Sequence, residues 1–237
     1  MKIIKQFFLL SFLLLFLVQS HAQIGFTGAY FQQNMPEWET AVFGDRSNED
    51  LLKTGYSFGV DYWLKPLENY RVELYPELLV NYSNKTTTNN VPSETFELAS
   101  VGFNLNTNIY LLNIESDCDC PTFSKQESFF EKGFFIQVSP GLHYFKGNID
   151  YQADNSIQTN TMTDLVPKLG IGLGVDIGIS DFITITPIVK YNRYFNVEWD
   201  GLLATLNEPT SNVVLGSNTT NINQFYAGIH IGVRWNE

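Results

Sequence analysis

Residues Leu165 to Ile179 read LVPKLGIGLGVDIGI, and this stretch decides the fold. Every second residue from Leu165 onward is a large apolar side chain or a proline. The residues between are mostly glycine, with Lys168 and Asp176 among them. A period of two belongs to a β-strand whose two faces meet different surroundings. The stretch is therefore predicted to be one long strand with an apolar face and a face of small and polar residues.

The same alternation recurs before and after this strand. It is found in Ile24–Asn34, Lys53–Lys65, Tyr70–Asn84, Glu97–Asn113, Phe134–Tyr144, Ile183–Asn192 and Phe225–Trp235. Eight such strands predict an all-β fold, an eight-stranded antiparallel up-and-down transmembrane β-barrel. A soluble lipocalin-like barrel is an alternative at this point, because it has the same period with its apolar face turned inward.

Three features favour lipid against the apolar face. The strands are longer than the roughly 5–6 residues of an average strand, and they reach the roughly 9–11 residues that a spanning strand needs. The polar face is rich in glycine, asparagine and serine, which suit a narrow lumen. Aromatic residues near the predicted strand ends match the girdles found at membrane interfaces. They are Tyr62, Trp63, Tyr70, Tyr191, Trp199 and Trp235.

The first 22 residues have the anatomy of a secretory signal peptide. Lys2 and Lys5 give a short positive region, residues 7–18 form an apolar run, and Ser20-His21-Ala22 supplies a small-x-small cleavage site. A membrane anchor is the weaker interpretation, because the run is shorter than a bilayer span. We therefore expect residues 1–22 to be removed and residues 23–237 to form one outer-membrane β-barrel domain.

The chain is acidic, with 14 lysines and arginines against 25 aspartates and glutamates and a formal net charge of −11. Nucleic-acid binding needs a basic surface, so nucleic acid is not expected as a partner. Much of the acid lies in predicted loops, where water solvates it.

Two cysteines, Cys118 and Cys120, lie in the predicted connection Asn113–Lys132. An oxidising periplasm favours a disulfide between them. Free thiols or a bond to another chain are a second interpretation. A metal site is a third, although no histidine lies nearby to complete it. We expect the disulfide, and no cofactor or metal.

The connections alternate in length as in outer-membrane barrels, which have short periplasmic turns and longer outer loops. Lys65–Asn69 and Ser180-Asp181 are short. The longer, polar connections are predicted to face outward, and they are Met35–Leu52, Ser83–Ser93, Tyr151–Thr163 and Asp200–Ile222. The connection Asn113–Lys132 is long although it lies on the periplasmic side, so a periplasmic partner is expected there.

Three segments make the chain resemble the small outer-membrane β-barrels of the OmpA/OmpX type, in particular the porin-family or PorT-like barrels. They are the signal-peptide end His21-Ala22-Gln23, the glycine-alternating run Gly170–Gly178 and the last strand Phe225–Trp235. The resemblance implies an outer-membrane location with lipid around the barrel, and an assembly machinery that reads an aromatic end of the last strand. Here Asn236 and Glu237 follow Trp235, so that aromatic is displaced from the end.

Charged side chains lie on the polar face of several predicted strands. They are Asp61, Arg71, Glu73, Glu77, Lys168, Asp176, Lys190, His230 and Arg234. Inside a narrow barrel these charges should pair, since an unpaired buried charge is costly. We expect an ionic and hydrogen-bonded plug, because eight strands leave an interior that side chains just fill. A polar path for small solutes is the alternative.

The two histidines of the mature chain, His143 and His230, both lie on the inward face in mid-strand. No Ser-His-Asp or Asp-His grouping can be assembled around them. The sequence therefore predicts a non-enzymatic outer-membrane barrel that acts in structural or interaction roles, through its outward loops and its long periplasmic connection. Its expected partners are outer-membrane lipid, the barrel-assembly machinery and a periplasmic or surface protein. A narrow passive pore and a soluble lipocalin-like binding protein are the alternatives.

Overall fold

The computed structural model of the chain describes residues 23–43, 51–67, 70–87, 94–111, 133–153, 156–180, 182–200, 202 and 217–234. The predicted signal peptide, Cys118, Cys120, Trp235 and the connection Asn113–Lys132 lie outside these residues. Within the described ranges, no helix is long and apolar enough to cross a membrane.

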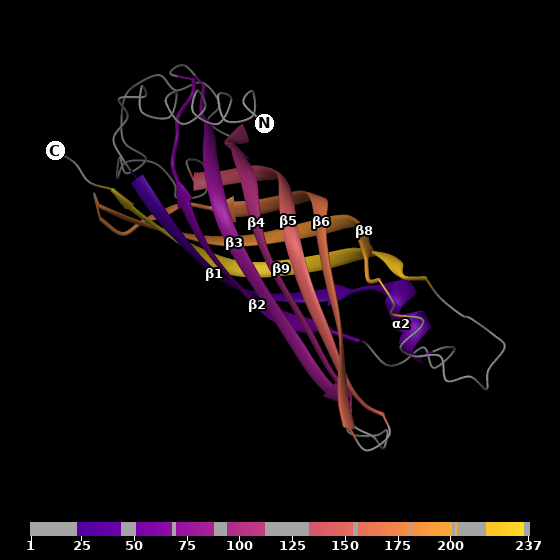
Figure 1. Ribbon diagram of the computed structural model, residues 1–237. Helices are drawn as coiled ribbons and strands as arrows, with labels where there is room; N and C mark the ends of the chain where they lie inside the picture. The colour runs from indigo at the N-terminus through magenta and orange to yellow at the C-terminus, as the bar shows by residue number, and fades with distance from the viewer. Residues whose placement is uncertain are drawn as a thin grey trace, which may run out of the picture.

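The described strands form one closed antiparallel barrel (Figure 1). In chain order the elements are β1 (Gln23–Asn34), α2 (Pro36–Phe43), β2 (Thr54–Tyr62), β3 (Val72–Thr87), β4 (Glu94–Ile109), β5 (Phe134–Ala153), β6 (Ser156–Val175), β7 (Ile177–Gly178), β8 (Ile183–Glu198) and β9 (Thr219–Arg234). Strand β9 pairs with β1 to close the sheet, and β7 continues β6 in the same register against β8 after an interruption at Asp176. The predicted eight-stranded up-and-down barrel is therefore confirmed.

The register of the strands gives the barrel a strong tilt. Paired residues can be followed around it from Gly25 through Asp61, Glu77, Asn104, Gly141, Lys168 and Tyr194 to Ile222. Ile222 precedes Asn223, the partner of Asn34, so the path returns to β1 at the level of Met35, ten residues beyond its start. At about 3.3 Å per residue and about 4.8 Å between strands, this stagger corresponds to a tilt of about 40°.

The strands are longer than a membrane requires. β3, β4, β8 and β9 have 16 residues each, and β5 and β6 have 20. At this tilt they rise about 40–50 Å along the barrel axis, whereas the apolar band of an outer-membrane barrel is about 25 Å tall. The strands therefore continue beyond the membrane at one end. Figure 1 shows the hairpins β3–β4 and β5–β6 and helix α2 at that end, opposite the start of β1 and the end of β9.

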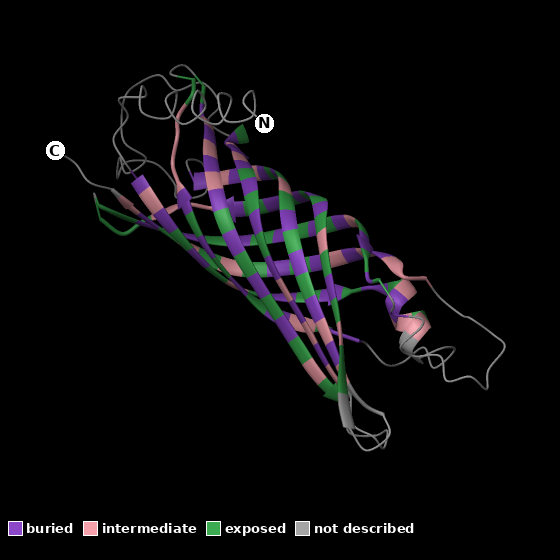
Figure 2. Ribbon diagram, viewed as in Figure 1, coloured by how far each residue is buried: buried purple, intermediate pink, exposed green. Residues whose placement is uncertain are grey.

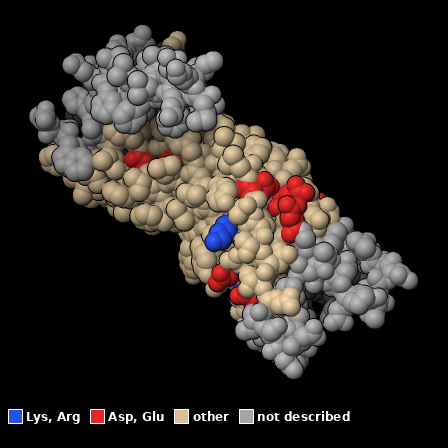
Figure 3. Space-filling model, viewed as in Figure 1, with Lys and Arg blue, Asp and Glu red and all other residues tan. Residues whose placement is uncertain are grey.

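A belt of large apolar side chains covers the outside of the spanning part. It includes Phe26, Phe58, Leu78, Val101, Phe103, Leu142, Leu165, Ile171, Val189, Phe225 and Ile229, each at least 43% exposed. Figure 2 shows the alternation of exposed and buried residues along the strands, and Figure 3 shows most of the visible charged atoms gathered toward the α2 end. A lipocalin-like barrel requires its apolar face inside, so that alternative is wrong.

Beyond the belt the two faces of the strands exchange polarity. On β5 the outward side chains change from Tyr144 to Lys146, while the inward side chains change from His143 to Phe145 and Ile149. Strands β4 and β6 make the same exchange. The projecting part is therefore built like a water-soluble β-barrel, with a polar outside and an apolar inside.

The apolar inside of the projecting part forms a single cluster, which we name the outer core. It consists of Met35, Trp38, Leu51, Leu52, Phe96, Leu98, Phe145, Ile149, Met162, Val166, Tyr194, Val197, Trp199, Leu202 and Ile222. The rings of Trp38 and Trp199 meet edge to face with centroids 5.3 Å apart. Residues from both ends of the chain's barrel domain thus share one core.

Two expectations about this end are wrong. Trp199 is fully buried and is not part of an interfacial girdle, because a bulge between Tyr194 and Val197, with Asn196 at a φ of 54°, redirects the end of β8. The connection Tyr151–Thr163 is not a loop, because β5 and β6 continue there as a paired hairpin. Thr159, Thr161 and Thr163 are exposed on the outer side of β6, and such polar residues resembled a loop in the sequence.

Helix α2 forms within Met35–Leu52, where the sequence suggested only a polar connection. Pro36 suits the first helical position, because an N–H group there has no partner inside the helix. The Met35 N–H donates to the Glu39 carboxylate at 3.4 Å, and the Thr40 hydroxyl donates to the Pro36 carbonyl at 2.8 Å. These local bonds begin the helix directly after β1.

Hydrogen bonds to strand β9 and to the residues before it fix the helix on the barrel. The indole Nε1–H of Trp38 donates to the Asn218 carbonyl at 2.8 Å, and the Thr220 hydroxyl donates to the Glu37 carboxylate. Trp38 is fully buried in the outer core. The helix therefore closes the projecting end of the barrel.

Candidate functional site in the barrel interior

The structure places most of the predicted charged residues inside the barrel. Asp61, Arg71, Glu73, Glu77, Lys168 and Lys190 are buried there, each at most 9% exposed. Asp176 and His230 line the same interior and are partly buried. Arg234 pairs with Gln23 through the backbone, and its side chain lies outside the described part of the chain. Neutral polar side chains lie among these charges, including Thr27, Ser57, Asn81, Ser100, Asn104, Asn106, Asn108, Gln137, Ser139, Thr186, Asn192 and Gln224.

Asp61 on β2 and His230 on β9 meet across the intervening strand β1. The Nε2 atom of His230 lies 3.1 and 3.2 Å from the two carboxylate oxygens of Asp61. Gly25 on β1 leaves room for this contact, because a Cβ atom there would lie 2.1 Å from the same nitrogen. The ring of Tyr75 stands edge-on to the imidazole, with centroids 5.8 Å apart. The contact between Asp61 and His230 therefore joins β2 and β9 across β1.

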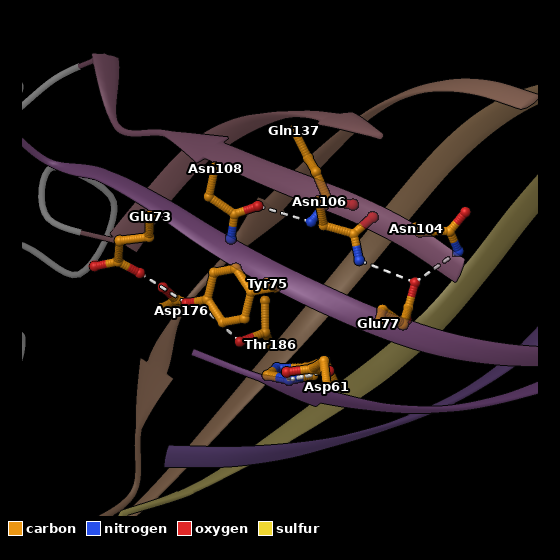
Figure 4. A network of polar contacts seen from close by, with 11 residues as sticks. Asp61, Glu73, Tyr75, Glu77, Asn104, Asn106, Asn108, Gln137, Asp176 and Thr186 are labelled. Carbon is orange, nitrogen blue, oxygen red and sulfur yellow. Dashed lines mark hydrogen bonds and ion pairs between the residues drawn. The ribbon is translucent and has the colours of Figure 1, made fainter. Parts of the chain in front are cut away.

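A second group joins β3, β4, β8 and the break between β6 and β7. The Tyr75 hydroxyl donates to a Glu73 oxygen at 2.7 Å. The Tyr110 hydroxyl contacts the same Glu73 oxygen at 3.0 Å and also contacts Asp176. The Thr186 hydroxyl donates to the other Asp176 oxygen at 2.5 Å. We name these five residues the acid cluster, and Figure 4 shows Glu73, Tyr75, Asp176 and Thr186 close together.

Two backbone and side-chain features position the acid cluster. The guanidinium carbon of Arg71 lies 4.1 Å from the centroid of the Tyr110 ring, a cation–π contact that leaves the charge on the arginine. The backbone N–H of Asp176 donates to the Gly133 carbonyl at 3.0 Å, although Asp176 itself interrupts the strand. The interruption thus directs a carboxyl group inward without leaving its N–H group unpaired.

The centre of the interior is built around Glu77. Asn104 and Asn106 donate their amide hydrogens to one Glu77 oxygen at 3.0 and 2.9 Å, as Figure 4 shows. The oxygen of Asn104 accepts a hydrogen bond from the Lys168 ammonium at 3.1 Å. Lys168 also donates to Ser139 at 3.1 Å. Asn104 therefore bridges a buried negative charge and a buried positive charge.

A serine, a histidine and an amide stand in a row next to this centre. The His143 Nε2 atom lies 3.0 Å from the Asn104 oxygen, and its Nδ1 atom lies 3.5 Å from the Ser100 hydroxyl. This order resembles a hydrolytic triad. All three residues are at most 4% exposed, and Asn81 donates to Ser100 at 2.9 Å. The barrel wall encloses Ser100, His143 and Asn104, so their hydrogen bonds contribute to the packing of the interior.

Two small cavities lie in the interior. One of about 20 Å³ is lined by Asp61, His230, Asp176, Glu77 and Lys190 among others. The second, of about 10 Å³, lies where the polar interior meets the outer core. A cavity needs about 10–15 Å³ to hold one water molecule. The larger cavity therefore has room for about one water molecule, and neither is large enough for a larger solute.

The sequence analysis selected the charged residues but missed the neutral groups that hold them. Asn104, Asn106, Asn108 and Tyr110 follow one another at every second position of β4 and its end, and all four are buried. This alternating run of asparagines was the available signal. Among the described residues, no group of three or more histidine, cysteine, aspartate or glutamate side chains is placed to hold a metal ion.

No protein-family model and no curated protein sequence matches the chain. Solved structures with a similar chain path are small outer-membrane barrels. Neisserial surface protein A is 11% identical, with a TM-score of 0.49 over 91% of this chain and 98% of that one. A major outer membrane protein from Thermus thermophilus is 11% identical, with a TM-score of 0.48 over 90% of this chain and 100% of that one.

The attachment invasion locus protein Ail of Yersinia pestis, solved with the heparin analogue sucrose octasulfate, is 10% identical, with a TM-score of 0.46 over 90% of this chain and 99% of that one. At such identities the likeness concerns the fold alone. The closed sheet and the apolar belt of this chain are the features of an outer-membrane barrel.

Proposed function

We propose that this protein is a non-enzymatic outer-membrane barrel with a closed lumen, which acts in structural or interaction roles through the end that projects from the membrane. The filled interior carries the proposal. Its cavities measure about 20 and 10 Å³, and the outer core closes the projecting end with Trp38 and Trp199 fully buried. Passage of an ion requires a continuous path lined by groups that replace its water shell. Cavities of this size support a lumen without such a path.

The projecting hairpins are the proposed contact surface for a partner at the cell surface. Cross-strand hydrogen bonds order their outward side chains: Thr86 with Thr95 at 3.3 Å, Thr159 with Asp150 at 2.6 Å and Thr161 with Asn148 at 3.1 Å. Side chains that are already ordered lose less freedom on binding, which favours affinity. We further propose that the connection Asn113–Lys132 meets a periplasmic partner and that the assembly machinery reads the last strand.

Single-channel recording in planar bilayers tests the closed lumen. The folded barrel, checked by its faster migration before boiling than after, should give no steady current at neutral pH. Steady currents in the wild type would contradict the proposal. If their ion selectivity also changed in Lys190→Gln or Glu77→Gln, the narrow-pore alternative would be correct.

A hydrolase assay tests the non-enzymatic assignment. Ester and amide substrates should not be turned over by the folded barrel in detergent, because Ser100 and His143 are enclosed. Turnover that Ser100→Ala abolishes would overturn the assignment. Turnover that persists in Ser100→Ala and His143→Gln would place an active site outside the described interior and would overturn it equally.

A further inference from the structure

Among the described side chains inside the spanning part, carboxyl groups outnumber lysine and arginine by four to three. The carboxyl groups are Asp61, Glu73, Glu77 and Asp176, and the basic groups are Arg71, Lys168 and Lys190, while the side chain of Arg234 lies outside the described residues. An excess negative charge in a closed, low-dielectric interior is strongly disfavoured. His143 does not supply the missing positive charge, because its Nε2 atom and the Lys168 ammonium share the same Asn104 oxygen. For the described groups to balance, one proton is held by a carboxyl group or by His230.

The hydrogen atoms of the acid cluster identify the carrier. The Tyr110 hydroxyl contacts both Glu73 and Asp176, but it has a single hydrogen to donate. The Tyr75 hydroxyl donates to the same Glu73 oxygen. If Tyr110 also donates to Glu73, the contact with Asp176 needs a hydrogen from Asp176 itself. The contact between His230 and Asp61 needs no added proton, because a neutral imidazole donates one N–H.

We propose that Asp176 is a buried proton-binding site, a neutral carboxylic acid that donates to Tyr110, which in turn donates to Glu73. The hydrogen bonds of the acid cluster lead to this site, and the charge count of the described groups agrees with it. With Asp176 neutral, three described carboxylates face three described cations. One hydrogen then lies between Asp176 and Tyr110, and another lies between Tyr110 and Glu73. Thr186 satisfies the second Asp176 oxygen at 2.5 Å.

The proton makes the stability of the barrel depend on pH, through the half opposite the projecting end. The groups that face Asp176 are Glu73 and Tyr75 from β3, Tyr110 from the end of β4, Thr186 and Lys190 from β8, and His230 from β9 across the cavity. Asp61 and Glu77 line the same cavity from β2 and β3. Loss of the proton adds a negative charge among three carboxylates. The unfolded chain, with an ordinary aspartate, does not hold this proton at neutral pH. The folded state therefore loses stability as pH rises.

Infrared spectroscopy of the folded barrel at neutral pH tests the site. The wild type should show the carbonyl band of a protonated carboxylic acid, and Asp176→Asn should lack it. His143→Gln is the matched control, since it alters a buried side chain outside the acid cluster, and it should keep the band. Tyr110→Phe preserves the ring beneath Arg71 and removes only the hydroxyl, so it should shift the band.

A pH series of unfolding measurements in detergent gives a second readout. As pH rises above the range in which an unfolded aspartate titrates, the unfolding equilibrium constant of the wild type should rise relative to that of Asp176→Asn, by up to about tenfold per pH unit, until the folded protein loses the proton as well. Absence of the band in the wild type, or a band that persists in Asp176→Asn, would overturn the proposal. So would the same pH dependence in the wild type and Asp176→Asn. None of these results depends on whether the lumen conducts.

Discussion

Replacing Trp38 with alanine should release helix α2 without unfolding the barrel. The Trp38 side chain is fully buried in the outer core. Truncating a buried tryptophan costs about 3–5 kcal/mol, and this range includes the lost hydrogen bond to Asn218 and the lost ring contact with Trp199. Helix α2 has eight residues, which is too short for independent stability. The loss should therefore fall on the helix, while the closed sheet retains its strand pairing.

Hydrogen–deuterium exchange of the barrel in lipid nanodiscs measures this effect. A loss of about 3–5 kcal/mol raises the population of the open helix roughly 10²–10⁴-fold, since about 1.4 kcal/mol is a factor of ten. Peptides covering α2 should therefore lose their protection in Trp38→Ala. Peptides from the belt region of β4 and β5 should exchange as in the wild type.

Trp38→Phe separates packing from hydrogen bonding. Phenylalanine keeps an aromatic ring against Trp199 but cannot donate to the Asn218 carbonyl, so the expected loss is about 1–2 kcal/mol and the increase in exchange about tenfold. Unchanged protection of α2 in Trp38→Ala would refute the closing role assigned to this side chain. Equal loss of protection in the belt would show that the outer core and the barrel open as one unit.

Two further pairs of variants test the inside and the outside of the barrel. Gly102→Ala should destabilise by about 1–3 kcal/mol in urea titrations, because its Cβ would lie 2.3 Å from the His143 ring, whereas Gly28→Ala, which meets open space, should be neutral or slightly stabilising. Phe103→Lys, within the apolar belt, should cost about 2–4 kcal/mol in vesicles, whereas Thr161→Lys on the projecting hairpin should cost about 0–1 kcal/mol. Equal costs for the two glycine variants would show that the inward and outward faces are misassigned. Equal costs for Phe103→Lys and Thr161→Lys would show that the position of the membrane is misassigned.

The barrel could be predicted because its signal is local. Alternation within Leu165–Ile179 identifies a two-faced strand without knowledge of its neighbours, and eight such strands have few ways to bury their backbone groups. The exchange of polarity was missed because period two continues through it. Its mark in the sequence is two neighbouring apolar residues, Tyr144-Phe145 on β5 and Leu165-Val166 on β6, where the apolar face moves from outside to inside.

The interior network was less accessible to sequence reasoning. The sequence offered Glu77 and Lys168 as charges on the polar face. The bridge between them depends on Asn104 from a third strand, which only the register brings there. Asp176 was treated as another alternating position of the strand. Its contacts with Tyr110 and Thr186 come from β4 and β8, so they too depend on how the sheet closes.

The bond between Trp38 and Asn218 joins partners that are 180 residues apart in the chain. A growing barrel that lacks β9 and the residues before it has no Asn218 carbonyl to accept the hydrogen bond from Trp38, and its outer core lacks Ile222. Such an intermediate would expose the apolar side chains of the outer core to water, and chaperones and quality-control proteases bind surfaces of this kind. Docking of the last strand would remove that surface in the same step that seals the sheet. Protease resistance of α2 would then report, during biogenesis, that the barrel is complete.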